Sequence, residues 1–212
     1  MSIELDHVFV CLSQGAPEAE HLVRFGLIEG PSNVHPGQGT ANRRFFFENA
    51  MLELLWVDNP NEARNEQTAP TQLWDRWSGR LDGATSPFGI VMRPTHQESI
   101  TPPFAAWEYK PDYFPAGMSL HIGDTGIDEP MWVFMPFLRQ RGREIPEHPN
   151  GVREITALTL KSPSPLRSGI AEALPILTIE PGPTHLLTVE FDHGVRNEST
   201  DLRRHLPLIL KR

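Results

Sequence analysis

Apolar and polar residues alternate over short stretches of this chain, and turn residues separate the stretches. In the N-terminal segment 3–11, every second position is apolar except for one histidine. Such alternation predicts a strand with one buried face. We expect that face to carry the side chains of Ile3, Leu5, His7, Phe9 and Cys11.

The pattern changes after this strand and predicts a helix followed by more strands. Pro17 suits the first turn of a helix, and Gly26 suits its C-terminal end. Segment 30–39 is rich in proline, glycine and polar residues and predicts a loop. Apolar runs predict the remaining elements, which are strands at 40–48 and 51–57 and a weaker strand within 27–34.

The rest of the chain divides into a central part and a tail. The central part has a short helix at 71–81 and strands at 86–93, 107–113, 118–123 and 131–138. Residues 152–192 repeat the strand–helix–strand–strand order of the N-terminal part. We therefore expect a first module at 1–58, a linker helix with central strands at 59–139, and a second module-like half at 140–212.

Composition narrows the fold class and the partners. The 21 prolines and 16 glycines among 212 residues favour short strands with many turns over a helical bundle. The net charge of −8 argues against nucleic acid as a partner. A single cysteine excludes a disulfide framework within the chain. Neither a signal peptide nor a long apolar segment is evident, so we expect a cytoplasmic protein without a membrane partner.

Two polar residues stand in otherwise apolar strand faces. His7 shares its face with Leu5 and Phe9, and Glu53 shares its face with Met51 and Leu55. A buried carboxylate is costly unless it is paired, hydrogen-bonded or bound to a metal. The two residues are therefore either ligands of a divalent transition metal or partners in a buried hydrogen bond.

The loop at 35–43, with sequence HPGQGTANR, is the next candidate site. Its two glycines allow the backbone to approach a ligand closely. Its polar side chains offer hydrogen bonds to a small molecule, and they are His35, Thr40, Asn42 and Arg43. The alternative is a turn that satisfies its own backbone. The motif of a phosphate-binding loop is missing from the sequence.

Trp107, in the aromatic run at 107–114, is a further candidate for the wall of a small-molecule pocket.

Three segments together resemble a known family. Their sequences, LDHVFV at 5–10, HPGQGTANR at 35–43 and MLELL at 51–55, are similar to glyoxalase-like domains of the vicinal oxygen chelate superfamily. The resemblance is most specific over residues 3–58, and residues 3–193 are interpreted as one such domain. It implies an α+β fold in which paired βαβββ modules form curved mixed sheets around a cupped cavity.

The resemblance also implies roles for individual residues. Catalytic members carry a His or Gln ligand on the first strand of a module and a Glu ligand on its last strand, and His7 and Glu53 match these positions. The implied cofactor is a divalent transition metal such as Zn, Fe, Mn or Ni, and Glu53 would also transfer a proton. His121 and Glu190 are further candidate ligands, although His121 lies opposite an apolar face and the register of Glu190 stays open.

Two functions follow from the resemblance, and the sequence leaves both open. The first is a metal-dependent lyase, isomerase or dioxygenase that acts on a substrate with two adjacent oxygens. The second is a metal-free protein that binds and sequesters a small molecule on the same fold. A small-molecule ligand is the partner in both, and the superfamily also implies a homodimer.

Overall fold

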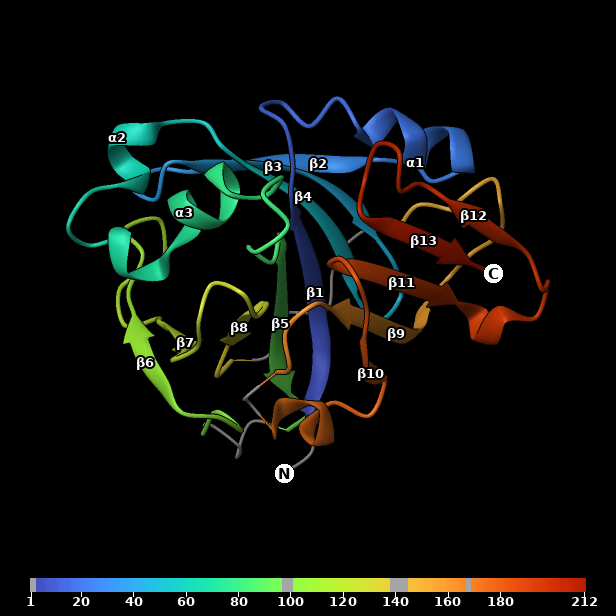
Figure 1. The fold of residues 1–212 in the computed structure, drawn as a ribbon. Coiled ribbons are helices and arrows are strands. Elements are labelled where there is room, and N and C mark those ends of the chain that lie inside the picture. The colour runs from blue at the N-terminus through green and yellow to red at the C-terminus, as the bar shows by residue number, and fades with distance from the viewer. Residues whose placement is uncertain (1–2, 97–100, 138–144, 167–168) are drawn as a thin grey trace.

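The structure of the protein is a computed structural model, and it describes residues 3–96, 101–137, 145–166 and 169–212 (Figure 1). Its strands form two mixed sheets, one of eight strands and one of five. The predicted α+β class and the curved mixed sheets are confirmed. The predicted boundary between residues 139 and 140 lies outside the described residues.

The larger sheet has the strand order β2-β3-β4-β1-β5-β8-β7-β6. Its strands are β1 (Ile3–Cys11), β2 (Gly30–His35), β3 (Thr40–Phe46), β4 (Met51–Val57), β5 (Phe88–Pro94), β6 (Ala106–Tyr109), β7 (Leu120–Gly123) and β8 (Met131–Phe134). Strand β1 pairs with β4 in parallel and with β5 in antiparallel orientation. The segment expected to be a loop at 30–39 therefore begins as strand β2, which pairs with β3 and leaves the turn at residues 36–39.

The two halves of this sheet have the same strand order when each is followed outward from the centre of the sheet. The first half runs β1-β4-β3-β2 and the second half runs β5-β8-β7-β6, with β1 and β5 side by side at the centre. In each half the first strand is parallel to the last, and the inner pairs are antiparallel. The first module therefore pairs with strands β5 to β8, and not with the expected second half at 140–212. Residues 88–135 form the second module and complete the larger sheet, whereas the C-terminal residues, the expected second half, form a sheet of their own.

The smaller sheet has the order β10-β9-β11-β13-β12. Its strands are β9 (Ile155–Ser162), β10 (Leu177–Pro181), β11 (Leu186–Phe191), β12 (Ser199–Asp201) and β13 (Leu208–Lys211). Strands β10 and β9 are parallel, β9 and β11 are antiparallel, and β11 and β13 are parallel. The strands β4-β1-β5-β8 of the larger sheet have the same arrangement. The tail therefore repeats the opening pattern in a shortened form, with a 3₁₀ turn at Gly169–Ala173 in place of the expected helix.

The helices of the described residues are short and lie at the margins of the larger sheet. They are α1 (Ala19–Phe25), α2 (Pro60–Ala63) and α3 (Leu73–Ser78), and two further 3₁₀ turns occur at Ala69–Thr71 and Asp192–Gly194. Gly26 ends α1 in the left-handed conformation, as the sequence predicted. Helix α3 is shorter than the expected 71–81, and Leu81 is exposed in the loop after it. None of the helices in this described part of the chain is long and apolar enough to span a membrane.

The hydrophobic core lies between the two sheets. Figure 1 shows the C-terminal strands, in orange and red, beside the central strands β1 and β5. Val8 and Val10 of β1 belong to the same buried cluster as Leu158 and Leu187 of the smaller sheet. One face of the larger sheet is therefore covered by the smaller sheet, and its other face is left to form a cavity.

An irregularity in β1 divides its side chains between the core and the cavity. The register with β5 shifts between Leu5 and His7, which is the signature of a β-bulge. Ile3 and Leu5 consequently belong to the core between the sheets, whereas His7 and Phe9 line the cavity. The expectation that all five alternating side chains share one face is wrong, because the bulge reverses the alternation at Asp6.

Candidate functional site

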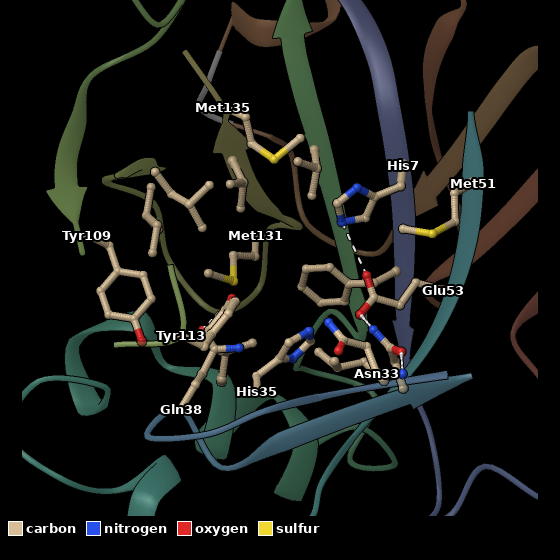
Figure 2. Close-up of a pocket in the computed structure, with 18 of the residues that line it drawn as sticks. His7, Asn33, His35, Gln38, Met51, Glu53, Tyr109, Tyr113, Met131 and Met135 are labelled. Atoms are coloured by element: carbon tan, nitrogen blue, oxygen red, sulfur yellow. Dashed lines mark hydrogen bonds and ion pairs between the residues drawn. The ribbon is translucent and has the colours of Figure 1, made fainter. Parts of the chain in front are cut away.

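A cavity of about 150 Å³ opens on the face of the larger sheet that the smaller sheet does not cover. Its polar side chains come from the first module and are His7, Asn33, His35, Gln38, Asn42, Arg44 and Glu53. The second module contributes apolar side chains, which are Val91, Leu120, Ile122, Met131, Val133 and Met135. Aromatic residues also line the cavity, namely Phe9, Tyr109, Tyr113 and Phe114, and Leu73 of α3 adds a further apolar contact. The cavity therefore has a polar wall on the first module, which also carries Met51 and Leu55 beside Glu53, and an apolar wall on the second module (Figure 2).

His7 and Glu53 meet at the polar wall. The Nε2 atom of His7 lies 3.2 Å from Oε2 of Glu53, and both residues are buried. The parallel pairing of β1 with β4 places Glu53 opposite Phe9. Phe9 lies two residues after His7 on the same face of β1, so the side chains of His7 and Glu53 are diagonal neighbours. Figure 2 shows the two side chains pointing toward each other from neighbouring strands. The structure thus brings together the pair that the sequence singled out.

The other nitrogen of His7 is also held by a carboxylate. Nδ1 lies 2.6 Å from Oδ1 of Asp6, and Arg93 of β5 binds the second oxygen of Asp6 at 3.1 Å. Ionised carboxylates only accept hydrogen bonds, and an imidazole donates from both nitrogens only when it is protonated. The two carboxylates therefore favour the imidazolium form of His7. Asp6 and Arg93 were missed by the sequence reasoning, although the position of Asp6 beside His7 was a signal.

The pKa shifts of the pair agree with this geometry. Burial lowers the pKa of His7, but the hydrogen bonds and charges of Asp6 and Glu53 outweigh it and raise the pKa above the ordinary value. Burial alone would raise the pKa of Glu53, but the hydrogen bond and charge of His7, helped by His35 and Asn42, lower it to about 2. Both shifts favour the charged forms of the pair, an imidazolium and a carboxylate.

Asn42 holds the second oxygen of Glu53. Its Nδ2 donates to Oε1 of Glu53 at 2.5 Å, and its own Oδ1 accepts from the backbone N–H of Asn33 at 2.8 Å. Asn42 thus orients the carboxylate of Glu53. Its expected hydrogen bond to a small molecule stays a prediction. Asn42 stands on β3 opposite Leu55 of β4, which explains why its side chain reaches the neighbouring strand.

A second polar group lies at the turn between β2 and β3. Nδ1 of His35 and Nε2 of Gln38 each lie 2.8 Å from Oγ1 of Thr40, which is buried. The ring of His35 stacks on Tyr113 with 4.8 Å between the ring centroids. His35 and Gln38 line the cavity, and Thr40 supports them from behind. The sequence reasoning did not single out Gln38, although it lies within the quoted loop.

The glycines of this turn serve the protein's own packing. Gly37 donates its N–H to Glu62 at 2.7 Å, and its carbonyl accepts from Asn65. A Cβ atom on Gly39 would lie 2.3 Å from the carbonyl oxygen of Asn59, and Gly39 has a φ of +72°. The close approach that the glycines allow is thus to the segment around α2.

Arg43 does not reach the cavity. Its guanidinium binds Glu29 at 2.5 and 2.7 Å and Glu20 at 3.2 Å. Asn42 points into the cavity, and successive side chains of a strand face opposite sides, so Arg43 must face away. The expected substrate-binding role of Arg43 is therefore wrong, and Arg44 lines the cavity instead.

Three other predicted site residues also lie outside the cavity. Trp107 packs edge-on against Tyr109, and Tyr109 is the one that lines the cavity. His121 alternates with the lining residues Leu120 and Ile122 on β7 and therefore faces away from it. Glu190 belongs to the smaller sheet. None of these three joins His7 and Glu53.

The donor set does not fit a metal of the expected kind. His7 and Glu53 are the two expected ligands of the first module, and both nitrogens of His7 lie beside carboxylates. His35 also lines the cavity, but its Nδ1 is hydrogen-bonded to Thr40. The second module lines the cavity with Val91, Met131 and Val133 where further ligands would stand. Within the described part of the chain, no group of three or more His, Cys, Asp or Glu residues is placed to hold a metal ion. A protein site for a transition metal usually has three or four such ligands.

Comparisons with known proteins agree with the fold. Residues 5–175 match the family described as glyoxalase-like domain. The structure is similar to that of a hypothetical protein from Staphylococcus aureus, with a TM-score of 0.50, 14% sequence identity and 99% of each chain covered. A hypothetical protein from Bacillus halodurans C-125 matches with a TM-score of 0.45 and 14% identity, over 68% of this chain and 100% of that one. Comparison with curated proteins gives no match. Since the family match spans most of its length, the chain belongs to the glyoxalase-like domain family.

Proposed function

We propose that this protein binds a small, largely apolar molecule in the cavity of its larger sheet and does so without a metal ion. The observation that carries this proposal is the pairing of His7 with two carboxylates, Asp6 and Glu53. An imidazolium has no lone pair to offer a metal. The pair therefore acts as a polar anchor in the cavity wall.

The size and lining of the cavity support this function. Its volume of about 150 Å³ is comparable to that of an apolar cavity that admits one benzene-sized molecule. Apolar walls with a few placed polar groups are typical of small-molecule sites. The second module lines the cavity with six apolar side chains, and the first module supplies the polar groups around the His7–Glu53 pair.

A metal-dependent lyase or dioxygenase is the second candidate, and one observation favours it. His7 and Glu53 converge at 3.2 Å, with Asp6 placed behind the imidazole as a carboxylate often is behind a ligating histidine. The low pKa of Glu53 argues against its expected role in proton transfer. A carboxylate with a pKa of about 2 is a weak base near neutral pH. The homodimer implied by the family stays a prediction.

Binding of an apolar probe to chelator-treated protein tests the proposed function. Toluene is added to the protein in the presence of EDTA, and binding is followed by ligand-observed NMR. We expect saturable binding that is lost in Val133→Phe, because the larger side chain fills the cavity from its apolar wall. Trp107→Phe, outside the cavity, is the matched control and should bind as the unmodified protein does. Binding that appears only after a divalent metal is added would contradict the proposal.

A further inference from the structure

The cavity wall offers a ligand one charged hydrogen-bond acceptor. Among the described residues that line the cavity, Glu53 is the one carboxylate. Oε1 accepts one hydrogen bond from Asn42, and Oε2 accepts one from His7. Each carboxylate oxygen has two lone pairs, so each can accept one more hydrogen bond. A donor group of a ligand in the cavity would complete this set.

Three neighbouring side chains with polar groups are hydrogen-bonded or ion-paired within the protein. Both ring nitrogens of His7 are bound to carboxylates. The hydroxyl of Tyr109 is hydrogen-bonded to Thr68, and the hydroxyl of Tyr113 donates to Gln38 at 3.4 Å. A ligand that carries a hydrogen-bond donor therefore finds its strongest available partner in Glu53.

Charge balance selects against charged ligands. The carboxylate of Glu53 is neutralised by the imidazolium of His7, and Asp6 is neutralised by Arg93. A ligand with a net charge would lose its hydration in the cavity, which is costly unless a counter-charge compensates it. Beside the ligand's donor group, Glu53 and His7 already compensate each other. Arg44, the other charged side chain of the wall, is hydrogen-bonded to the carbonyl oxygens of Pro31 and Ser32. An anion would also meet the carboxylate of Glu53, and a cation would meet the imidazolium of His7.

The shape of the remaining wall favours a flat ring. The rings of His35 and Tyr113 stack with an angle of 28° between their planes, and Phe114 packs edge-on against Tyr113. Phe9 and Met131 line the same space. Aromatic and thioether side chains make favourable contacts with aromatic rings. Figure 2 shows these groups around the cavity, with the labelled Met131 and Tyr113 facing the His7–Glu53 pair.

From these relationships we infer that the ligand is a neutral aromatic molecule with a hydroxyl or N–H group that donates a hydrogen bond to Glu53. This inference rests on the proposed function, since it names the class of molecule that occupies the same cavity. Its ring lies between the aromatic side chains and the apolar wall, and its donor group reaches the carboxylate.

Three probes of similar size test the inference, namely phenol, toluene and benzoate. Dissociation constants are measured by NMR titration at pH 7 for the unmodified protein and for Glu53→Gln. We expect phenol to bind at least about tenfold more tightly than toluene and benzoate to the unmodified protein, because a hydrogen bond to a charged group is worth about 1.4 kcal/mol or more. In Glu53→Gln the advantage of phenol over toluene should fall below about threefold, and benzoate should bind more tightly. Trp107→Phe, outside the cavity, is the matched control and should leave these ratios unchanged.

The outcomes separate the inference from the function on which it rests. Equal binding of phenol and toluene to the unmodified protein would overturn the inference and leave the cavity function standing, and this arm needs no variant to fold. A preference for phenol that persists in Glu53→Gln would also overturn it, because the donor would then meet another group. If none of the three probes binds, the proposed function fails as well.

Discussion

Nε2 of His7 on β1 lies 3.2 Å from Oε2 of Glu53 on β4, and both side chains face the same cavity. Removing one partner of a buried ion pair leaves the other without its counter-charge and costs about 3–5 kcal/mol. We therefore expect Glu53→Ala to lower the free energy of unfolding by that amount, measured by urea denaturation. Glu190→Ala, a half-buried glutamate of the smaller sheet, is the control and should change it by less than about 1 kcal/mol. Equal losses in the two variants would show that the pair contributes no special stability.

The contribution of the pair to stability depends on pH in a defined way. The folded-state pKa of His7 lies above 6.5, so its contribution is complete below pH 6.5 and is lost as the pH rises through the folded value. The folded-state pKa of Glu53 is about 2, so its contribution is complete above pH 4.5 and is lost as the pH falls toward 2. The difference in unfolding free energy between the unmodified protein and Glu53→Gln should be largest between these two limits. A difference that does not vary from pH 3 to pH 9 would contradict the assignment of charges.

His148 gives a second, independent pH effect at the contact between the two sheets. Its Nδ1 accepts the N–H of Ile28 at 3.0 Å, and its Nε2 lies 3.0 Å from the carbonyl oxygen of Phe46, so the ring is neutral with the proton on Nε2. Burial lowers its pKa below 6.5. Its contribution is present above pH 6.5 and is lost as the pH falls through the folded value. We expect His148→Gln to remove part of the stability loss on acidification below pH 6.5, as measured by thermal unfolding.

Cys11 should be inert in the folded protein. It is buried beside the cavity, and burial raises the pKa of its thiol to about 12. Since the thiolate is the reactive form, we expect a disulfide-exchange reagent to label Cys11 only after unfolding. Rapid labelling of the folded protein at pH 7 would show that the cavity end of β1 is open to solvent.

Gly39 tests the packing of the loop that supports His35 and Gln38. It combines a positive φ with a contact of 2.3 Å between a Cβ atom and the carbonyl oxygen of Asn59. Gly83 has a similar φ of +76° but nothing within 4 Å of a Cβ atom. Gly83→Ala should cost about 1 kcal/mol for its backbone conformation alone, and Gly39→Ala should cost at least about 2 kcal/mol more. Equal costs would mean that the contact with Asn59 relaxes freely.

The polar site of the first module could be predicted from the sequence because two of its strands carry a polar residue on an otherwise apolar face. His7 and Glu53 each interrupt an apolar stripe, and both stand in the cavity wall. Alternation along a strand also shows that Asn42 and Arg43 cannot both face the cavity, because neighbouring side chains of one strand face opposite sides. The sequence therefore already contained the signal that only one of the two lines the cavity.

Other parts of the site could not be predicted from local patterns. The bulge at Asp6 depends on the pairing of β1 with β5, and nothing in the alternation of residues 3–11 indicates it. The second wall of the cavity consists of Val91, Met131 and Val133, which look like ordinary core residues in the sequence. The partner of the first module was likewise decided by strand order, because the tail shows the same sequence pattern and forms a separate sheet.

The metal content of the purified protein tests the central claim most directly. The protein is prepared without chelator and its content of Zn, Fe, Mn and Ni is measured by elemental analysis. Because His7 is held as an imidazolium by Asp6 and Glu53, we expect well below one metal ion per chain. About one metal ion per chain, lost in Glu53→Ala, would contradict the account and favour the metal-dependent enzyme.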